Sequence, residues 1–431
     1  MLPKKADFNG GLYQFLDASP TPFHAVAQLS TMLEASGFKP LNAFDNWSLV
    51  AGEKYFVTHN GSALIAFVVG QDDAWTRGIR MVGAHTDSPC LMVKPKPEIW
   101  TNGYLQLGVE VYGGALLNPW FDRDLSIAGR IVFQSAEGQL SHQLIDFEHP
   151  VATIPSLAIH LDRDANKNRS VNPQKDLPPI LMQVTEKMDF RQLLASRFLS
   201  PNDQVLDYEL CFYDTQGTAI VGLGNEFFSS ARLDNLLSCY VGAQAIAQAD
   251  GSHHCLLFLS DHEEVGSVSA SGADGPFLES VIERMLSSSV AASQVLGRSL
   301  LVSCDNAHAV HPNFKTAHDA QHQPKLNGGP VIKTNVKQRY ATNSLTSGRF
   351  RKLCSDADIP LQTFVSRSDV GCGSTIGPIA AARLGIPTID VGIPQFAMHS
   401  CRETAGVEDP ILLAMALESF FNLAESLAWD G

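Results

Sequence analysis

Short apolar runs alternate with helical stretches in two separated parts of the chain. The apolar runs are IRMVGA (residues 79–84), CLLFLS (255–260), SLLVSC (299–304) and IPTIDVGIP (386–394). Helical spacing of apolar residues is found in residues 233–249, 280–293 and 409–428. Strands that alternate with helices are typical of an α/β layer. We therefore predict a mostly parallel central sheet flanked by helices.

The segment between these two parts has a different pattern. Residues 94–230 are rich in Gly and Pro and contain alternating runs such as YLQLGVEVYG (104–113) and GRIVFQS (129–135). Such runs, separated by turn residues, predict a mostly β structure. We expect an inserted β-rich domain over residues 94–230, which interrupts a main domain formed by residues 1–93 and 231–431.

The composition excludes several classes of protein. The 431 residues are 45% hydrophobic and 18% charged, with a net charge of −14, so nucleic acid and anionic membrane surfaces are not expected partners. The N-terminus lacks the apolar core of a signal peptide, and no apolar stretch reaches bilayer length. These features predict a cytoplasmic protein. The 8 cysteines are dispersed without a Cys-x-x-Cys pair, so a metal site would use His and carboxylates.

Polar side chains follow the apolar runs at the points where the predicted strands end. Because parallel strands end at the same edge of a sheet, ligands bind in the crevice beyond that edge. Two adjacent glutamates there are notable, because one can bind a metal while the other acts as a base on water. The side chains in question are His85, Asp87, Asp234, Asp261, His262, Glu263, Glu264, Asp305, His308 and His399.

This set of residue types indicates the kind of metal. Imidazole and carboxylate without thiolate favour zinc, with Co²⁺ or Mn²⁺ as substitutes. Two histidines and three carboxylates exceed the needs of one tetrahedral ion, but they supply two ions if one carboxylate bridges, as in two-metal hydrolases. Asp87, two residues after His85, can accept a hydrogen bond from the second imidazole nitrogen.

Simpler interpretations exist for the individual motifs. The sequence DHEEVGS (261–267) alone is compatible with an acidic loop at a helix N-terminus, and it is not an H-E-x-x-H motif because residue 266 is Gly. The glycine-rich SDVGCGSTIGP (368–378) lacks the lysine of a phosphate-binding loop, which favours an ordinary turn into a helix, and a role in shaping the substrate cleft is the alternative.

Taken in order, the motifs resemble those of aspartyl aminopeptidases, which are cytosolic dizinc exopeptidases that remove N-terminal Asp or Glu. The similarity extends over nearly the whole chain and includes segments of the insertion. The motifs that carry it are AHTDSP, SSARLDNL, DHEEVGS, DNAHAVHPN, SDVGCGSTIGP and FAMHSCRE, together with GGALLNPWFDRDLSIAGR and AIHLDRDANKNRSVNPQ.

The resemblance implies a role for individual residues. It implies two Zn²⁺ ions per subunit, with Asp234 as the bridge, Glu263 as general base and Asp87 as partner of His85. It also implies a cis peptide between Asp234 and Asn235. The first zinc would be held by His85, Asp234 and Asp305, the second by Asp234, Glu264 and His399, and the substrate would be bound by His160, His308, Lys333 and Tyr340.

The implied reaction is hydrolysis of the first peptide bond by a metal-bound hydroxide. The implied assembly is a tetrahedral dodecamer built from dimers, in which the insertion is the dimerisation domain and His160 reaches a neighbouring active site. Two alternatives are a dizinc carboxypeptidase or deacylase on the same scaffold and a non-catalytic assembly protein. The presence of Glu263 argues against the second alternative, because a scaffold needs no base.

Overall fold

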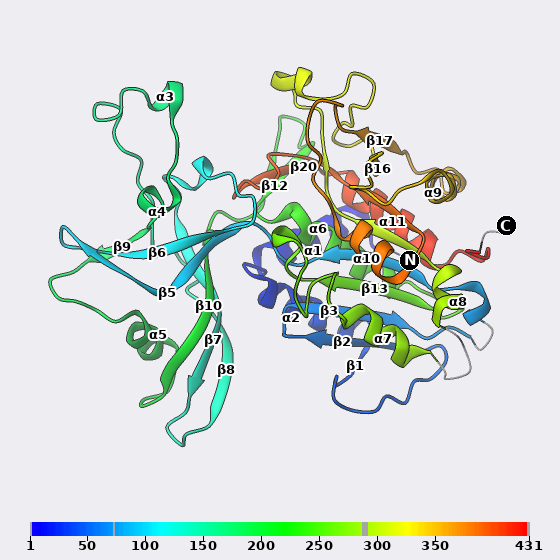
Figure 1. The fold of residues 1–431 in the computed structure, drawn as a ribbon, viewed down its shortest axis with the longest axis horizontal. Coiled ribbons are helices and arrows are strands. Elements are labelled where there is room, and N and C mark those ends of the chain that lie inside the picture. Colours follow the sequence, from blue (N-terminus) through cyan, green and yellow to red (C-terminus); the bar gives the residue numbers. More distant parts are fainter. Residues whose placement is uncertain (1, 72–73, 287–291, 429–431) are drawn as a thin grey trace. The chain divides into compact units, whose positions relative to one another are not determined.

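The computed structural model describes residues 2–71, 74–286 and 292–428, which form two compact units (Figure 1). The main unit comprises Met1–Asp87, Thr218–Met398 and Glu403–Gly431, and the inserted unit comprises Ser88–Gly217 and His399–Arg402. The chain therefore leaves the main unit after strand β4 and returns to it before strand β11.

The main unit contains helices and strands in alternation. In chain order they are α1 (Lys5–Asp17), α2 (Pro22–Ala35), β1 (Lys39–Pro40), β2 (Lys54–His59), β3 (Ala63–Val68), η1 (Ala74–Arg77), β4 (Arg80–His85), β11 (Ala219–Val221), β12 (Phe227–Ser230), α6 (Leu233–Ala247), β13 (Cys255–Ser260), η3 (Glu263–Val265), α7 (Phe277–Met285), α8 (Ala292–Gly297), β14 (Leu300–Cys304), β15 (Ala307–His308), η4 (Pro312–Ala317), β16 (Val331–Thr334), α9 (Ser344–Asp356), β17 (Gln362–Val365), α10 (Ile376–Leu384), β18 (Thr388–Gly392), β19 (Pro394–Phe396), β20 (Glu403–Gly406) and α11 (Asp409–Phe421).

The large sheet of the main unit has the order β1-β2-β3-β13-β4-β14-β18-β16-β17. Its centre is parallel, because β13 and β14 flank β4 and β14 pairs with β18 in the same direction. Antiparallel pairs of β13 with β3 and of β18 with β16 adjoin this centre. The predicted α/β class is confirmed, and the parallel part is the part whose strand ends carry the candidate ligands.

Helices cover both faces of this sheet. Leu257 and Leu259 of β13 pack in the core cluster that contains α1, α2, α6 and α11. The alternating residues Leu256 and Phe258 pack in a second cluster with α7, α8 and α10. Since successive side chains of a strand point to opposite faces, β13 is buried on both sides, which explains its continuous apolar sequence.

Two of the predicted helices have different bounds in the structure. The stretch 280–293 contains the end of α7 and the start of α8, while residues 287–291 lie outside the described residues. The C-terminal helix was predicted to reach residue 428, and this is wrong, because α11 ends at Phe421. Beyond it, the carbonyls of Leu423 and Glu425 accept hydrogen bonds from the buried Arg80, so this backbone binds a side chain instead of continuing the helix.

The inserted unit is built around an antiparallel sheet with the order β8-β7-β10-β5-β6-β9. Its core includes Trp120, Ile131, Phe190 and Phe212. Its elements are β5 (Cys90–Thr101), β6 (Tyr104–Tyr112), η2 (Asn118–Trp120), β7 (Leu125–Gln134), β8 (Leu140–Asp146), α3 (Ala165–Asn168), α4 (Pro173–Asp176), β9 (Ile180–Gln183), α5 (Phe190–Phe198) and β10 (Gln204–Asp214).

The unit boundaries lie at 87/88 and 217/218, whereas 93/94 and 230/231 were expected. Strand β5 begins at Cys90 and pairs with β6 and β10 of the inserted sheet. At the other boundary, β11 and β12 pair with each other, and β12 pairs with β20 of the main unit. Strand pairing, which the change in composition does not reveal, explains both differences.

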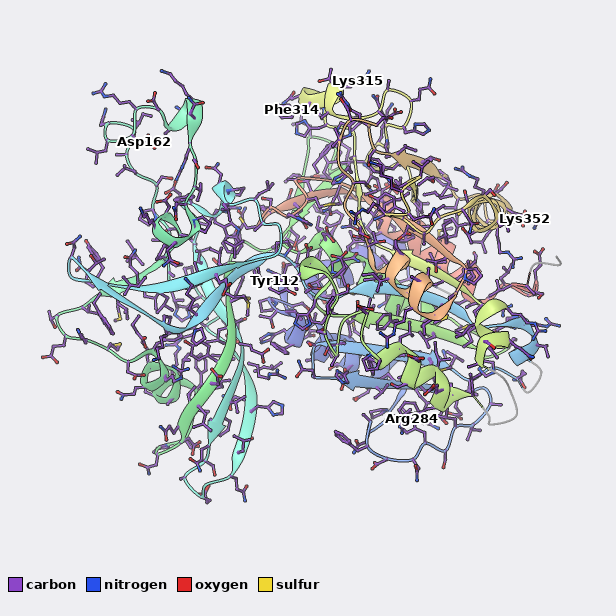
Figure 2. The ribbon with its side chains drawn as sticks, in the orientation of Figure 1. Tyr112, Asp162, Arg284, Phe314, Lys315 and Lys352 are labelled. Carbon is purple, nitrogen blue, oxygen red and sulfur yellow. The ribbon has the colours of Figure 1, made fainter. Side chains whose placement is uncertain are left out.

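Side chains on the surface of the main unit include Arg284 of α7, whose guanidinium lies 3.5 Å from the ring centroid of Trp47, and the exposed Phe314 of η4 (Figure 2). Among the residues described, no helix combines the length and the apolar character that crossing a membrane requires.

Candidate metal centre

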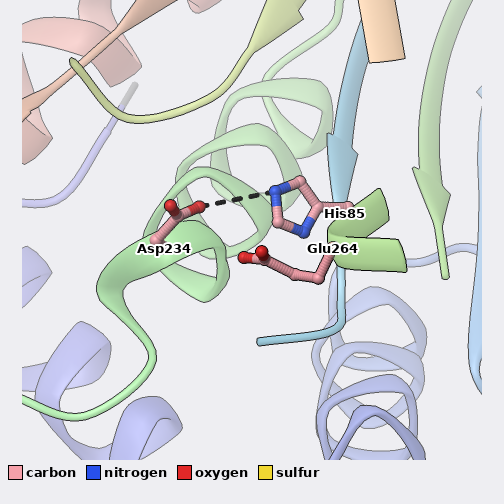
Figure 3. A group of neighbouring side chains, drawn as sticks. All are labelled: His85, Asp234 and Glu264. Atoms are coloured by element: carbon pink, nitrogen blue, oxygen red, sulfur yellow. Dashed lines mark ion pairs between the residues drawn. The ribbon is translucent and has the colours of Figure 1, made fainter. Parts of the chain in front are cut away.

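Three side chains of the main unit form a group that could hold a metal ion (Figure 3). His85 ends β4, Asp234 lies at the start of α6, and Glu264 lies in η3, which begins three residues after β13 ends at Ser260. One ligand atom from each of them lies within 4.8 Å of the others. The distance from His85 Nε2 to Asp234 Oδ1 is 3.4 Å.

The topology of the sheet brings these side chains together. In the parallel pair of β4 and β13, His85 is aligned with Ser260, so the residues after both strands leave the sheet at the same edge. Asp234 has φ −81° and ψ 103°, outside the helical range, and the predicted cis peptide between Asp234 and Asn235 is present. The edge predicted from the apolar runs is therefore the edge at which the group lies.

Two further carboxylates approach the same imidazole nitrogen. His85 Nε2 lies 3.9 Å from Asp305 Oδ1 and 4.0 Å from Glu263 Oε2. Asp305 follows β14, the other neighbour of β4. The structure thus brings together His85, Asp234, Glu263, Glu264 and Asp305, as the sequence predicted.

Asp87 connects the loops that follow β4 and β13. Its carboxylate, 1% exposed, accepts hydrogen bonds from the backbone N–H groups of Glu263 and Glu264, each at 3.1 Å. Its Oδ1 also lies 3.2 Å from His85 Nδ1, the contact that the sequence predicted. Asp87 therefore orients the histidine and the two glutamates at once, which extends the function that the sequence suggested.

The electrostatics of the group reflect crowded negative charge. Burial alone would lower the pKa of His85, but the carboxylates of Asp234, Asp305 and Asp87 raise it well above its ordinary value. Burial and then nearby carboxylates, among them Asp234, raise the pKa values of Glu263 and Glu264. Protons are retained where like charges are crowded, and a divalent cation in the group would replace them. The donor set of imidazole and carboxylates fits zinc.

Lys333 has a partner that the sequence did not indicate. It lies on β16, 2% exposed, and its Nζ donates to Asp305 Oδ2 and to the carbonyl oxygen of Asn306, both at 3.1 Å. The same nitrogen lies 4.9 Å from the ring centroid of Tyr340, which is also buried. Lys333 is therefore a buried cation held beside Asp305 and not a solvent-exposed surface lysine.

The remaining predicted site residues lie in two places, strand β15 and the inserted unit. His308 forms β15 with Ala307, and its ring packs edge-on against Phe364 at 5.7 Å. His399 and His160 belong to the inserted unit, where His399 Nδ1 lies 3.1 Å from the carbonyl oxygen of Gly114. Their roles remain predictions.

Sequence reasoning missed one buried acid next to the group. Glu403 Oε2 accepts a hydrogen bond from the backbone N–H of Asp234 at 3.0 Å. It is the last residue of the motif FAMHSCRE, six residues before α11 begins at Asp409, and no apolar pattern around it marks it as buried, so the sequence carried no signal for it.

Comparison with known proteins supports the interpretation of this site. The family model described as "Aminopeptidase I zinc metalloprotease (M18)" matches residues 15–421. A "Probable M18 family aminopeptidase 2" from Pseudomonas aeruginosa (strain UCBPP-PA14) is 56% identical over 427 residues, which cover 98% of this chain and 99% of the relative. The protein of the same name from Pseudomonas putida (strain F1) is 56% identical over 423 residues, which cover 97% and 98%.

Solved structures share the fold over nearly the whole chain. A chain in the structure of the Ape4 and Nbr1 complex has a TM-score of 0.92 and 36% identity, covering 97% of this chain and 86% of that one. The mApe1 dodecamer of S. cerevisiae has a TM-score of 0.84 and 28% identity, covering 96% of both. The M18 aminopeptidase of Thermotoga maritima has a TM-score of 0.85 and 25% identity, covering 97% and 96%.

Fold and site together define a metallohydrolase of the α/β class. Its histidine and carboxylates lie at the C-terminal ends of the parallel strands in the large sheet. The chain belongs to the M18 family of zinc aminopeptidases. Membership in this family favours the aminopeptidase interpretation over a carboxypeptidase, a deacylase or a non-catalytic scaffold.

Proposed function

We propose that this aminopeptidase binds two zinc ions per subunit and prefers peptides with an N-terminal Asp or Glu. The observation that carries the two-metal part is the number of carboxylates around one imidazole nitrogen. Asp234, Asp305 and Glu263 lie between 3.4 and 4.0 Å from His85 Nε2, and Glu264 belongs to the same group. Apart from the base Glu263, the candidate ligands are His85, Asp234, Glu264, Asp305 and His399, which is more than the four that one tetrahedral ion takes.

The proposed ligand assignment is the one that the resemblance to aspartyl aminopeptidases implies, with Asp234 as the bridge. His85, Asp234 and Asp305 hold one ion, while Asp234, Glu264 and His399 hold the other. Asp87 accepts hydrogen bonds from the backbone N–H groups of both Glu263 and Glu264. With both backbones fixed in this way, Glu264 can bind the metal while the carboxylate of Glu263 stays available as a base.

Glu263 is the proposed general base. Bound zinc lowers the pKa of a water molecule and polarises the carbonyl oxygen of the substrate. Glu263 takes a proton from the attacking water on its carboxylate and delivers it to the nitrogen of the departing amine. Burial already raises the pKa of Glu263 above its usual range, a shift in the direction that such a proton carrier requires.

Lys333 and Tyr340 are the proposed source of the acidic preference, and His160 and His308 are proposed to contact the substrate as well. A bound carboxylate must exchange water for a cation or several donors. Lys333 is a buried cation, and the ring of Tyr340 lies beside it. Its hydrogen bond to Asp305 supports a position close to the metal centre, where the N-terminal residue of a substrate is held.

We further propose a cytoplasmic homo-oligomer, a tetrahedral dodecamer built from dimers through the inserted unit. The dodecameric mApe1 structure and its 28% identity over 96% of both chains support this assembly. Light scattering of the purified protein measures its mass, and a monomer at micromolar concentration contradicts the proposal.

The main experiment is a substrate panel. The purified protein is loaded with zinc, and amides of Asp, Glu, Leu and Ala are compared by kcat/KM, each with a free and with an acetylated N-terminus. We expect the free Asp and Glu amides to be cleaved fastest, the acetylated ones not at all, and a chelator to abolish turnover. Faster cleavage of Leu or Ala amides would refute the acidic preference, and cleavage of acetylated substrates would refute the exopeptidase mechanism.

A further inference from the structure

A buried carboxylate lies between the strands that lead to two candidate ligand loops. Glu403 is the first residue of β20 and is 1% exposed. It belongs to the small sheet β11-β12-β20-β19-β15 of the main unit. In this sheet β12 leads into the loop with Asp234, and β15 follows directly after Asp305 and Asn306.

Glu403 belongs to a chain of buried hydrogen bonds that connects these two loops. One carboxylate oxygen accepts from the backbone N–H of Asp234 at 3.0 Å, and the other accepts from Gln395 Nε2 at 3.2 Å. Gln395 Oε1 in turn accepts from Asn306 Nδ2 at 2.6 Å. Asp234 and Asp305, the acids proposed to share one ion, are thus held through Glu403, Gln395 and Asn306.

The direction of these hydrogen bonds explains why position 403 carries an acid. Both oxygens of Glu403 act as acceptors, so a glutamine there would turn an NH₂ group toward another donor. Burying a carboxylate is costly, but leaving a buried donor without an acceptor is costly as well. An acid at this place is therefore suited to a site that needs two acceptors, one for each ligand loop.

We propose that Glu403 is a positioning residue of the metal centre, which sets the spacing between Asp234 and Asp305 through its bonds to the Asp234 backbone and to Gln395. This inference rests on the proposed function, in which both acids bind the same ion. Residues that hydrogen-bond to metal ligands typically change metal affinity or activity by about 10–100-fold when they are mutated.

The first variant is Glu403→Gln, which keeps the size of the side chain and reverses the polarity of one hydrogen bond. Zinc affinity is measured by competition with a chromophoric chelator, and the stability of the metal-free protein by urea unfolding. We expect zinc binding to weaken by about 10–100-fold, with a parallel loss in kcat/KM. An unchanged zinc affinity would overturn the inference.

A double variant distinguishes positioning from a general loss of stability. In Gln395→Glu/Glu403→Gln, the amide at 403 accepts from the Asp234 N–H and donates to the carboxylate at 395, whose other oxygen accepts from Asn306. Every hydrogen bond between Asp234 and Asn306 is then restored, with the carboxylate at position 395 instead of position 403. We expect zinc affinity to return to near that of the wild type. A double variant that binds zinc as weakly as Glu403→Gln, or that does not fold, would contradict the inference.

Asp409→Asn is the matched control. Asp409 is also buried and accepts two backbone hydrogen bonds, from Asn327 and Gly329, but it contacts no proposed ligand. It should lower the stability of the metal-free protein without changing zinc affinity. If this control weakens zinc binding as much as Glu403→Gln does, the effect of Glu403 is not specific. If the wild type itself binds no zinc, the proposed function fails. If the wild type binds zinc and Glu403→Gln binds it equally well, only the inference about Glu403 fails.

Discussion

Replacing Lys333 with methionine tests how the positive charge beside Asp305 is used. Lys333 Nζ lies 3.1 Å from Asp305 Oδ2, and both side chains are largely buried. Methionine keeps most of the volume but removes the charge and both hydrogen bonds. In the metal-free protein, Asp305 would then lose its cation.

The expected magnitude follows from the distance. Two unit charges 3.1 Å apart attract by about 5 kcal/mol at an effective dielectric constant of about 20. Removing one member of a buried pair usually costs about 3–5 kcal/mol, because the other charge remains buried. Because the Asp305 side chain is still 12% exposed to water, we expect a loss at the lower end of this range, about 3 kcal/mol in the unfolding free energy of the metal-free variant.

A zinc ion bound by Asp305 supplies the missing charge, so the loss should be smaller with zinc bound. By thermodynamic linkage, the variant must then bind zinc more tightly than the wild type does. If about half of the loss is recovered, the gain is about 1.5 kcal/mol, or roughly tenfold in affinity.

The assay is urea unfolding of the wild type and Lys333→Met, with zinc and with chelator, together with zinc titration of both proteins. An equal loss of stability with and without zinc would refute the idea that Lys333 and the metal neutralise the same carboxylate. The same variant tests the substrate preference, because losing a charge-assisted hydrogen bond of about 1.5–3 kcal/mol should lower kcat/KM for an Asp amide by roughly 10- to 100-fold. An unchanged ratio of Asp to Leu amide cleavage would place the acidic preference elsewhere.

Four further changes have distinct outcomes. Glu263→Gln should lower kcat by about 10²- to 10⁴-fold with zinc content unchanged, because it removes a base and no ligand; elemental analysis that finds the zinc lost would contradict that role. Asp234→Ala should lose zinc from both positions, and full occupancy would exclude Asp234 as the bridge. Asp87→Asn should destabilise the metal-free protein by about 1–3 kcal/mol for each backbone N–H that then faces an amide donor, and an unchanged urea midpoint would refute this. Burial raises the pKa of Asp409 to about 7, above the ordinary value of about 3.9, so its contribution to stability is complete below pH 4 and is lost as the pH rises through 7. Relative to Asp409→Asn, the wild type should therefore become less stable between pH 4 and 8, and parallel pH profiles would argue against the shift.

The central part of the site was predictable because it depends on local pattern and topology. The apolar runs before His85, Glu263 and Asp305 are strands buried on both faces, and parallel strands bring their ends to one edge. Asp234 was found through the helix that follows it. These relations require only the order of strands and helices along the chain.

The supporting contacts were not predictable in the same way. Lys333 and Asp305 meet because β16 and β14 both adjoin β18, an arrangement that no sequence period reveals. Glu403 and Gln395 lie in short strands whose polar residues resemble those of a surface loop. The unit boundaries also depend on which strands pair, which composition does not report.

The position of β4 has a consequence for the order in which the protein is made. This strand is synthesised before the inserted unit, but its partners in the sheet, β13 and β14, are synthesised after it. Nearly all residues of the inserted unit lie within 88–217, so most of that unit can collapse on the ribosome while β4 still waits for both neighbours. Early compaction of the insert shortens the effective loop between β4 and β13 and thereby lowers the entropy cost of closing the sheet. A destabilised insert would therefore leave β4 and its apolar side chains exposed during translation, and aggregation of new chains would appear before any loss of activity in folded molecules.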